Sequence, residues 1–148
     1  MKIYLDVCCL NRPFDDQSQH RIRLEAEAVI AILEHCQSKD WQLVGSEVID
    51  FEISQTPDAD RKERVSILAA IAQFKVVVDQ KIVNRAMELH RLGLKPFGAL
   101  HIACAEEEQV DVLLTTDDEL LHKITQKNIT IDVKVANPLK WLTEVIEG

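Results

Sequence analysis

Short runs of apolar and β-branched residues alternate along this chain with longer segments whose apolar residues recur every three or four positions. Residues 2–5 form the first run, which has the length and composition of a buried strand. Strands that alternate with helices pair in parallel through right-handed crossovers, and the helices cover the faces of the sheet. The alternation therefore predicts an α/β fold with a mostly parallel sheet and helices on both faces.

The expected elements follow from the same periodicities and from turn and cap residues. The expected strands are residues 2–5, 42–45, 74–78, 111–114 and 129–135. The expected helices are a long one with Ala26, Val29, Ile30 and Leu33 on its apolar face, residues 47–55, one capped by Asp58 or Asp60, one running from near Ile82 to near Gly93, one after Pro96, one starting near Asp117, and one opened by Asn137. Polar N-caps and proline in the first helical turn support these starts.

The length and composition are those of one soluble domain spanning residues 1–148. No stretch approaches the roughly 20 apolar residues of a membrane span. The start, Met1 to Asp6, is too short and too soon acidic for a signal peptide, so we expect a cytoplasmic protein without membrane contact. The net charge of −8 argues against a general electrostatic nucleic-acid binder, although acids that surround a divalent cation contribute to such a total.

The four cysteines do not form a metal-binding pattern. Cys8 and Cys9 are adjacent, Cys36 and Cys104 lie in apolar helical patterns, and no C-x-x-C pair exists. Zinc-ligand spacing is absent, and a free cysteine in an apolar pattern behaves as a small hydrophobic residue. We therefore expect neither a disulfide nor a zinc site.

Several acids stand at or after the predicted strand ends, where sites in parallel sheets form. Asp6 ends the first strand, Asp79 the third, and Asp117 follows the fourth, while Glu52 lies on the helix after the second strand. Each alone could be a helix cap or an exposed residue. Together, carboxylates in one pocket repel each other unless a cation neutralises them, and hard oxygen ligands suit Mg²⁺ or Mn²⁺. Such ions activate water and stabilise the leaving oxygen in phosphodiester hydrolysis.

Four segments give the chain a family resemblance. They are Ile3-Tyr4-Leu5-Asp6, residues 46–53 (SEVIDFEI), residues 96–105 (PFGALHIACA) and Leu113-Leu114-Thr115-Thr116-Asp117. In this order they resemble a PIN domain across essentially the whole chain. The resemblance implies a three-layer α/β/α sandwich with a five-stranded, mostly parallel sheet and a Mg²⁺- or Mn²⁺-dependent ribonuclease activity. It also implies an RNA substrate, an antitoxin partner of the VapBC type and a homodimer, because many small stand-alone members are toxins that dimerise.

The resemblance assigns the site residue by residue. Asp6 matches the first family acid, Glu52 the helical glutamate and Asp117 the acid of the T-x-D segment, so these three are the expected catalytic and metal-binding residues. Thr115 matches the hydroxyl that precedes the last acid. Asp118, next to Asp117, is expected to support the site and to compensate in part for a missing acid.

Two positions depart from the family pattern. By the resemblance, a further acid is expected at the helix start where this chain has Gly98, and a small polar residue where it has Cys8. Glycine is acceptable as an N-cap, so the fold should tolerate it. Loss of a carboxylate should cost at least the 10–100-fold that a lost supporting partner costs. His101, one turn after Gly98, is expected to be a core or surface residue and not a ligand. Gly98 is either native or introduced to silence a toxic nuclease.

Three functional hypotheses follow. The first is a metal-dependent endoribonuclease that is weakened or inactive because of Gly98. The alternative is a non-catalytic module with the same fold that binds an antitoxin-like protein or RNA. The third is another α/β phosphoryl enzyme, with Asp79 and Lys134 in receiver-like roles. The third is the least favoured, because the acid pair of a receiver's first strand is absent and the residues Asp6 to Cys8 lack the second aspartate of a dehalogenase-type site.

Overall fold

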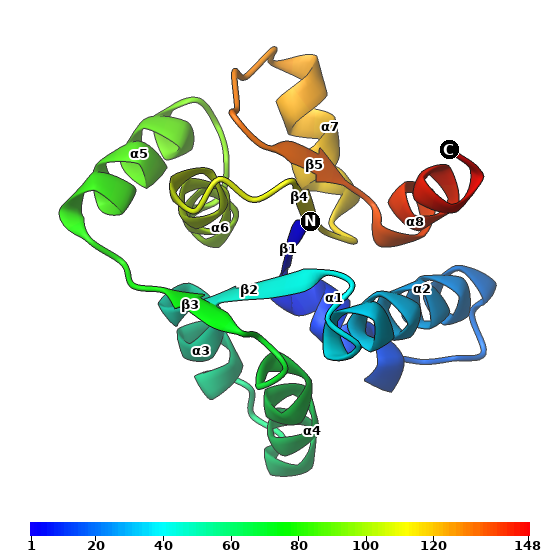
Figure 1. Cartoon of the computed structure of the whole chain (residues 1–148). Helices are drawn as coiled ribbons and strands as arrows, with labels where there is room; N and C mark the ends of the chain where they lie inside the picture. The colour runs from blue at the N-terminus through cyan, green and yellow to red at the C-terminus, as the bar shows by residue number, and fades with distance from the viewer.

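Five parallel strands form one sheet at the centre of the computed structural model, which describes all 148 residues (Figure 1). The strand order is β3-β2-β1-β4-β5. The strands are β1 (Lys2–Leu5), β2 (Gln42–Ser46), β3 (Phe74–Val76), β4 (Val112–Leu114) and β5 (Lys134–Ala136). Every pairing is parallel, and Ile3 in the central strand lies beside Leu43 and Val112. The predicted α/β class with a parallel five-stranded sheet is confirmed.

Helices cover both faces of the sheet. They are α1 (Val7–Asn11), the short 3-10 helix η1 (Arg12–Phe14), α2 (His20–Gln37), α3 (Glu47–Ser54), α4 (Ala59–Ala69), α5 (Gln80–Arg91), α6 (Pro96–Glu107), α7 (Asp118–Gln126) and α8 (Pro138–Glu147). On one side α2 packs against α8, and on the other α5 packs against α6 (Figure 1). The predicted three-layer arrangement follows from these two helical layers. No helix combines the length and apolarity that a membrane crossing needs.

Side-chain caps begin several helices where the sequence predicts them. Asp58, rather than Asp60, caps α4 and accepts hydrogen bonds from two backbone N–H groups at 3.0 and 3.3 Å. Asn137 caps α8 in the same way, at 2.9 and 3.2 Å. Asp79 caps α5, with its carboxylate accepting from the N–H of Ile82 at 2.9 Å. Such caps satisfy backbone donors that the helix itself leaves free.

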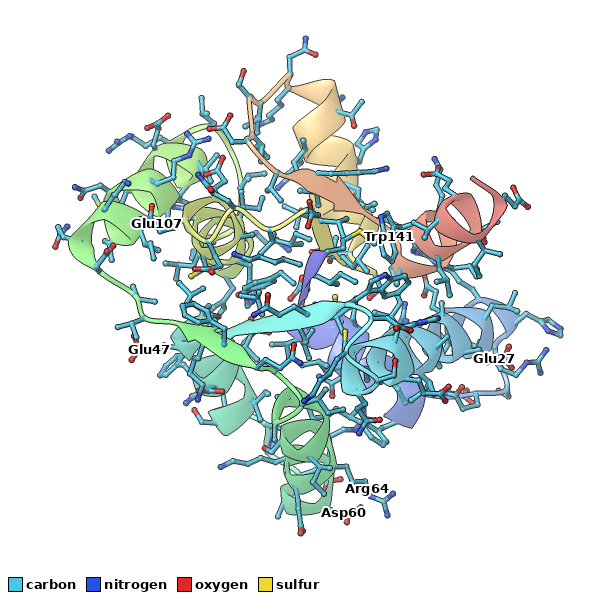
Figure 2. The ribbon with its side chains drawn as sticks, in the orientation of Figure 1. Glu27, Glu47, Asp60, Arg64, Glu107 and Trp141 are labelled. Carbon is cyan, nitrogen blue, oxygen red and sulfur yellow. The ribbon has the colours of Figure 1, made fainter.

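The core is the space between the sheet and the two helical layers. The residues of β1 and β4 are almost all fully buried, and Trp141 of α8 closes one side (Figure 2). Charged residues such as Glu27, Asp60 and Arg64 point to solvent in the same view. Ile30, which was expected on the buried face of α2, is 38% exposed, whereas Ile32 is fully buried. The buried stripe of α2 still contains Ala26, Val29 and Leu33, and Ile30 lies at its exposed edge.

Two predicted strands are shorter than expected by two residues or more, and the reason lies in contacts with distant side chains. The last strand was predicted over residues 129–135 but covers only β5. The carbonyl of Thr130 accepts a hydrogen bond from Arg85, and the N–H of Asp132 donates to Glu106, each at 2.9 Å. Side chains of α5 and α6 thus occupy the backbone groups that a sheet ladder would use. In the same way, β3 ends at Val76 because the next available N–H, that of Val78, donates to Glu47 at 2.7 Å.

The strand order places a topological switch point between β1 and β4. The chain leaves β1 toward β2 and leaves β4 toward β5, so the helices that follow these two strands lie on opposite faces. Asp6 continues the pairing by donating its N–H to the carbonyl of Leu114 at 3.0 Å. A crevice opens at such a point beyond the carboxyl ends of the strands.

Candidate metal centre

Asp6 stands at the end of β1 with its carboxylate held inside the switch-point crevice. The residue is 8% exposed, and its side chain makes no cap hydrogen bond to α1, although it occupies the cap position. Instead Oδ2 accepts a hydrogen bond from the hydroxyl of Thr115 at 2.9 Å. The carboxylate is therefore not used by the local backbone, which leaves it free for a ligand.

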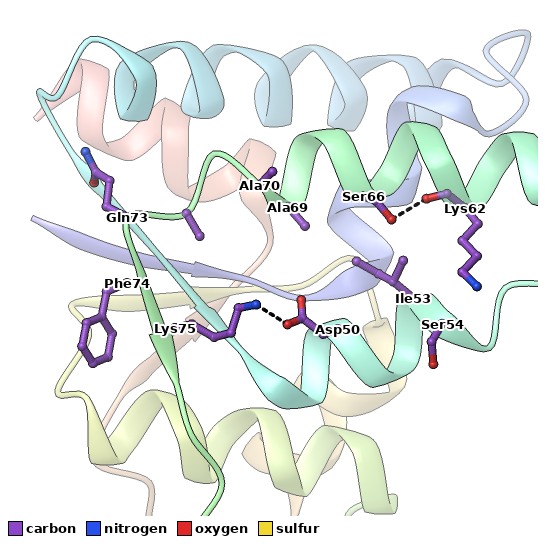
Figure 3. A pocket seen from close by; sticks show the side chains of 11 residues that line it. Asp50, Ile53, Ser54, Lys62, Ser66, Ala69, Ala70, Gln73, Phe74 and Lys75 are labelled. Atoms are coloured by element: carbon purple, nitrogen blue, oxygen red, sulfur yellow. Dashed lines mark hydrogen bonds and ion pairs between the residues drawn. The ribbon is translucent and has the colours of Figure 1, made fainter.

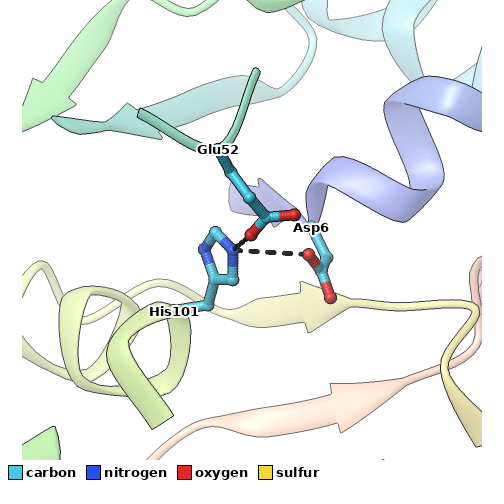
Figure 4. Close-up of side chains that lie close together, drawn as sticks. All are labelled: Asp6, Glu52 and His101. Atoms are coloured by element: carbon cyan, nitrogen blue, oxygen red, sulfur yellow. Dashed lines mark hydrogen bonds and ion pairs between the residues drawn. The ribbon is translucent and has the colours of Figure 1, made fainter. Parts of the chain in front are cut away.

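Glu52 reaches the same place from α3. Its Oε1 lies 2.8 Å from Nε2 of His101, and that nitrogen lies 3.5 Å from Oδ1 of Asp6 (Figure 4). One donor atom from each of the three side chains fits within 4.8 Å of the others. The structure thus brings together two of the three acids that the sequence singles out, and it adds a histidine.

Asp117 is the N-cap of α7, and its carboxylate can both cap the helix and face the pocket. Its Oδ1 accepts cap hydrogen bonds from the N–H groups of Glu119 and Leu120, at 3.0 and 3.3 Å. The residue also lines a pocket of about 410 Å³ together with Asp6 and Glu52. Both cap bonds use one oxygen, so Oδ2 is not committed to the helix. Asp117 lies outside the tight group formed by Asp6, Glu52 and His101.

Thr115 links the two strand-end acids. Its hydroxyl donates to Asp6 and accepts the N–H of Asp117 at 3.1 Å. The sulfur of Cys8 lies 3.3 Å from the same hydroxyl and accepts the N–H of Thr116 at 3.3 Å. Cys8 therefore fills the place of the expected small polar residue with a weak hydrogen-bonding group.

Gly98 lines the same pocket as the three acids, but it is not the N-cap that the sequence suggests. Lys95 occupies the N-cap position of α6 without a side-chain cap bond, Pro96 follows it, and Gly98 is the third residue of the helix. A Cβ atom at Gly98 would lie 3.4 Å from Leu120, which is ordinary van der Waals contact. The position therefore has room for a side chain at its first carbon.

Asp118 points away from the acids. Its side chain is 65% exposed and accepts two hydrogen bonds from Arg21 of α2, which lower the pKa of Asp118. It does not line the pocket that Asp6 and Asp117 share. The geometry therefore offers no route by which Asp118 replaces the acid absent at Gly98.

Other acids also have structural partners. Asp50 forms an ion pair with Lys75, as expected of a residue on the face of α3 away from Glu52. This pair lines a separate groove of about 540 Å³ between α3, α4 and β3 (Figure 3). The groove is larger than the acidic pocket, but its only acid is already neutralised. Asp79 caps α5 and Lys134 pairs with Glu144, so the receiver-like roles have no site.

His101 is the functional residue that sequence reasoning missed. It is 1% exposed, which fits the expected core position, yet its ring touches both acids. Burial lowers the pKa of His101, but the hydrogen bond to Glu52 and the charges of Asp6 and Glu52 outweigh burial and raise it above its ordinary value. A usable signal was the spacing, because His101 lies one turn after Gly98, the position at which the resemblance expects an acid.

The donor set fits a hard divalent cation. Asp6 and Glu52 place carboxylate oxygens side by side, and Asp117 adds a third carboxylate at the pocket wall. Mg²⁺ and Mn²⁺ prefer such oxygens and keep several waters, for which an open pocket leaves space. Two carboxylates held together are stabilised by a cation between them.

Comparisons with known proteins agree with this fold. The PIN domain family model matches residues 3–126. FitAcB from Neisseria gonorrhoeae is similar at 17% identity and a TM-score of 0.57, covering 92% of this chain and 97% of that one. VapBC2 from Rickettsia felis, solved with a promoter DNA fragment, is similar at 13% identity and a TM-score of 0.61, covering 93% and 98%.

A third structure, PAE2754 from Pyrobaculum aerophilum, is similar at 15% identity and a TM-score of 0.53 over the full length of both chains. A comparison with curated protein sequences gives no match. The structural likenesses establish the fold, and the family model covers far more than half of the residues. The chain belongs to the PIN domain family.

Proposed function

We propose that this protein is a Mg²⁺- or Mn²⁺-dependent endoribonuclease whose activity is weakened by Gly98. The observation that carries the proposal is the meeting of Asp6 and Glu52 at the β1–β4 switch point, with Asp117 in the wall of the same pocket. These three side chains would hold the cation. When bound there, a divalent cation activates water and stabilises the oxygen that leaves in phosphodiester hydrolysis.

The protein's own residues have distinct tasks in this proposal. Thr115 fixes the orientation of Asp6 through its 2.9 Å hydrogen bond. Lys95 and Lys123 stand on the pocket rim and share Glu119 as an ion-pair partner, so the rim carries more positive than negative charge. Such a rim suits the phosphates of a single-stranded RNA next to the acidic floor.

Gly98 is the reason to expect weak activity. It removes a carboxylate from a pocket that otherwise contains the family acids. The two other acids nearby are engaged elsewhere: Asp118 pairs with Arg21, and Glu119, which lines the pocket, pairs with Lys95 and Lys123. Partners that only support a metal site already contribute about 10–100-fold to affinity or activity. The loss at Gly98 should be at least that large.

The test is Mn²⁺-dependent cleavage of a single-stranded RNA by the parent chain and by Gly98→Asp, Asp117→Asn and Asp118→Asn variants. We expect Gly98→Asp to cleave at least 10–100-fold faster than the parent and Asp117→Asn to abolish the remaining activity. Asp118→Asn is the matched control and should behave as the parent. A folded Gly98→Asp variant with no gain, together with an Asp117→Asn variant that binds Mn²⁺ as the parent does, would show that the site is wrongly assigned.

A second candidate is a non-catalytic module that binds an antitoxin-like protein. The favouring observation is an exposed aromatic pair beside the pocket, Phe51 and Phe97, which are 55% and 40% exposed with ring centroids 6.1 Å apart. Exposed aromatic clusters are typical of protein interfaces. The likeness to VapBC2 supports a partner of this kind. Calorimetric titration with Mn²⁺ separates the two candidates, because a purely binding module has no need of tight metal affinity.

We also propose a cytoplasmic location and a homodimer as the working state of the protein. The exposed apolar side chains on several helices support self-association, and they include Ile67 at 63% and Met87 at 51% exposure. Sedimentation equilibrium of the purified chain tests the dimer, and a monomer at micromolar concentration would exclude it.

A further inference from the structure

A buried chain of hydrogen bonds runs behind the two carboxylates. The hydroxyl of Tyr4 lies 2.7 Å from Oγ of Ser46 and 2.6 Å from Nδ1 of His101, and Nε2 of His101 lies 2.8 Å from Glu52. Tyr4, Ser46 and His101 are each no more than 1% exposed. The chain of bonds joins β1, the end of β2, α6 and α3, so it does not serve any single element.

The chemistry of the carboxylate fixes one proton in this chain of bonds. An ionised Glu52 only accepts, so Nε2 of His101 carries a proton and donates it. In the neutral ring Nδ1 accepts from Tyr4, and in the charged ring it donates to Tyr4, so Tyr4 anchors Nδ1 in either form. Ser46 accepts the N–H of Ile49 at 3.1 Å and shares a further hydrogen bond with Tyr4 at 2.7 Å. No buried side-chain nitrogen or oxygen is left without a partner.

The proton on Nε2 lies between both acids. It points to Glu52 at 2.8 Å, and Asp6 is 3.5 Å from the same nitrogen (Figure 4). Two carboxylates that share a pocket repel each other, and a donor between them reduces that repulsion. His101 therefore favours the close arrangement of Asp6 and Glu52 before any cation binds.

We propose that His101 is a positioning residue, locked by Tyr4, that holds Glu52 beside Asp6 in the arrangement a divalent cation needs. This inference rests on the metal site of the proposed function. His101 acts through Glu52 and is not itself a ligand, because its Nε2 is used as a donor and its side chain does not line the pocket. The ring nitrogens thereby have different tasks: Nδ1 is anchored and Nε2 orients the carboxylate.

The first test is nuclear magnetic resonance of the full chain, with ¹⁵N-labelled histidine, before and after addition of Mg²⁺. We expect a protonated Nε2 in both states and a slowly exchanging Nε2–H, since the ring is buried. In the Tyr4→Phe variant the same signal should exchange faster, because Nδ1 has lost its hydrogen-bond partner. Loss of the Nε2 proton on addition of Mg²⁺ would make His101 a ligand and overturn the proposal.

The second test is the Mn²⁺ affinity of His101→Leu, His101→Gln and Tyr4→Phe variants, measured by calorimetry alongside thermal unfolding. His101→Leu should weaken binding about 10–100-fold, and His101→Gln should recover part of the loss because its amide can still donate to Glu52. Tyr4→Phe keeps the ring and should show a smaller loss. Unchanged affinity in a folded His101→Leu protein contradicts the positioning role.

The two proposals fail in different ways. If the parent binds Mn²⁺ with the expected variant effects but even Gly98→Asp cleaves no RNA, the ribonuclease proposal fails while the role of His101 stands. If Gly98→Asp cleaves RNA and His101→Leu binds Mn²⁺ as tightly as the parent, the role of His101 fails alone. The resonance of Nε2–H in the metal-free protein depends neither on RNA cleavage nor on Mn²⁺ binding.

Discussion

Arg21 on α2 donates two hydrogen bonds to Asp118 on α7, of 2.5 and 2.7 Å. The same guanidinium reaches the buried Glu25 at 3.2 Å, which also accepts from Arg12 at 2.9 Å and from Asn137 at 2.6 Å. This network ties α2 to the starts of α7 and α8. Asp118 thus belongs to an ion-pair network beside the candidate metal centre and does not line the pocket of that centre.

Replacing Asp118 tests that separation. Asp118→Asn should leave Mn²⁺ affinity unchanged, because the side chain faces Arg21. It should lower the free energy of unfolding by no more than about 1 kcal/mol, the usual range for an exposed ion pair. Calorimetric titration and urea unfolding measure the two effects. A tenfold loss of Mn²⁺ affinity would return Asp118 to the metal site.

Glu25 should matter far more for stability than for metal binding. It is 1% exposed, and Glu25→Leu removes the acceptor from Arg12 and Asn137. We expect a loss of about 3 kcal/mol in the free energy of unfolding, at the lower end for a broken buried pair because Arg21 can turn to water. Glu27→Leu, at an exposed position two residues later, is the matched control in urea unfolding. Equal effects of the two changes would contradict the network.

Gly98→Ala should stabilise the protein. Gly98 lies inside α6, where glycine costs roughly 0.5–1 kcal/mol relative to alanine, and the added Cβ meets Leu120 at an ordinary 3.4 Å. We expect the free energy of unfolding to rise by about that amount without any change in Mn²⁺ affinity. Urea unfolding measures it. A destabilised variant would mean that close packing around position 98 requires a glycine.

Thiol alkylation should distinguish Cys8 from the other cysteines. Cys8 is half-buried at the pocket, whereas burial raises the pKa of Cys36 to about 11 and of Cys104 to about 12, and raises that of Cys9 well above its usual value. With pKa values this high, the three buried thiols stay protonated at pH 8. They should therefore react slowly, because only thiolates alkylate readily. Mass spectrometry after brief iodoacetamide treatment should find label on Cys8 first.

The Cys8→Ser variant controls this experiment and should take up label only on the time scale of unfolding. Early label on Cys36 or Cys104 would show that the packing around α2 or α6 opens more readily than the buried side chains indicate. The assay therefore also reports on local stability next to the pocket.

The parts of the fold that rest on local patterns were predictable from sequence. The strand that ends at Asp6 and the caps at Asp58 and Asn137 depend on residues within a few positions of one another. The extent of the last strand was not predictable, because Arg85 and Glu106 take the backbone groups around Thr130 and Asp132 from far along the chain.

The same distinction applies to the site. Asp6 and Glu52 could be placed near each other because parallel strands present their carboxyl ends at one edge of the sheet. The contact between His101 and Glu52 depends on how closely α3 approaches α6, which no periodicity encodes. The direction of Asp118 was unpredictable for a similar reason, since it is set by Arg21 on another helix.

The acids of the centre come from separate elements that the chain completes at different times during synthesis. Asp6 lies on the first strand, Glu52 on a helix after the second, and Asp117 only after the fourth. A nascent chain on the ribosome therefore has no assembled centre until the segment with Asp117 has emerged and β4 has docked beside β1. Under the proposed function, the chain therefore cannot cleave the ribosomal RNA around it before β4 has docked beside β1.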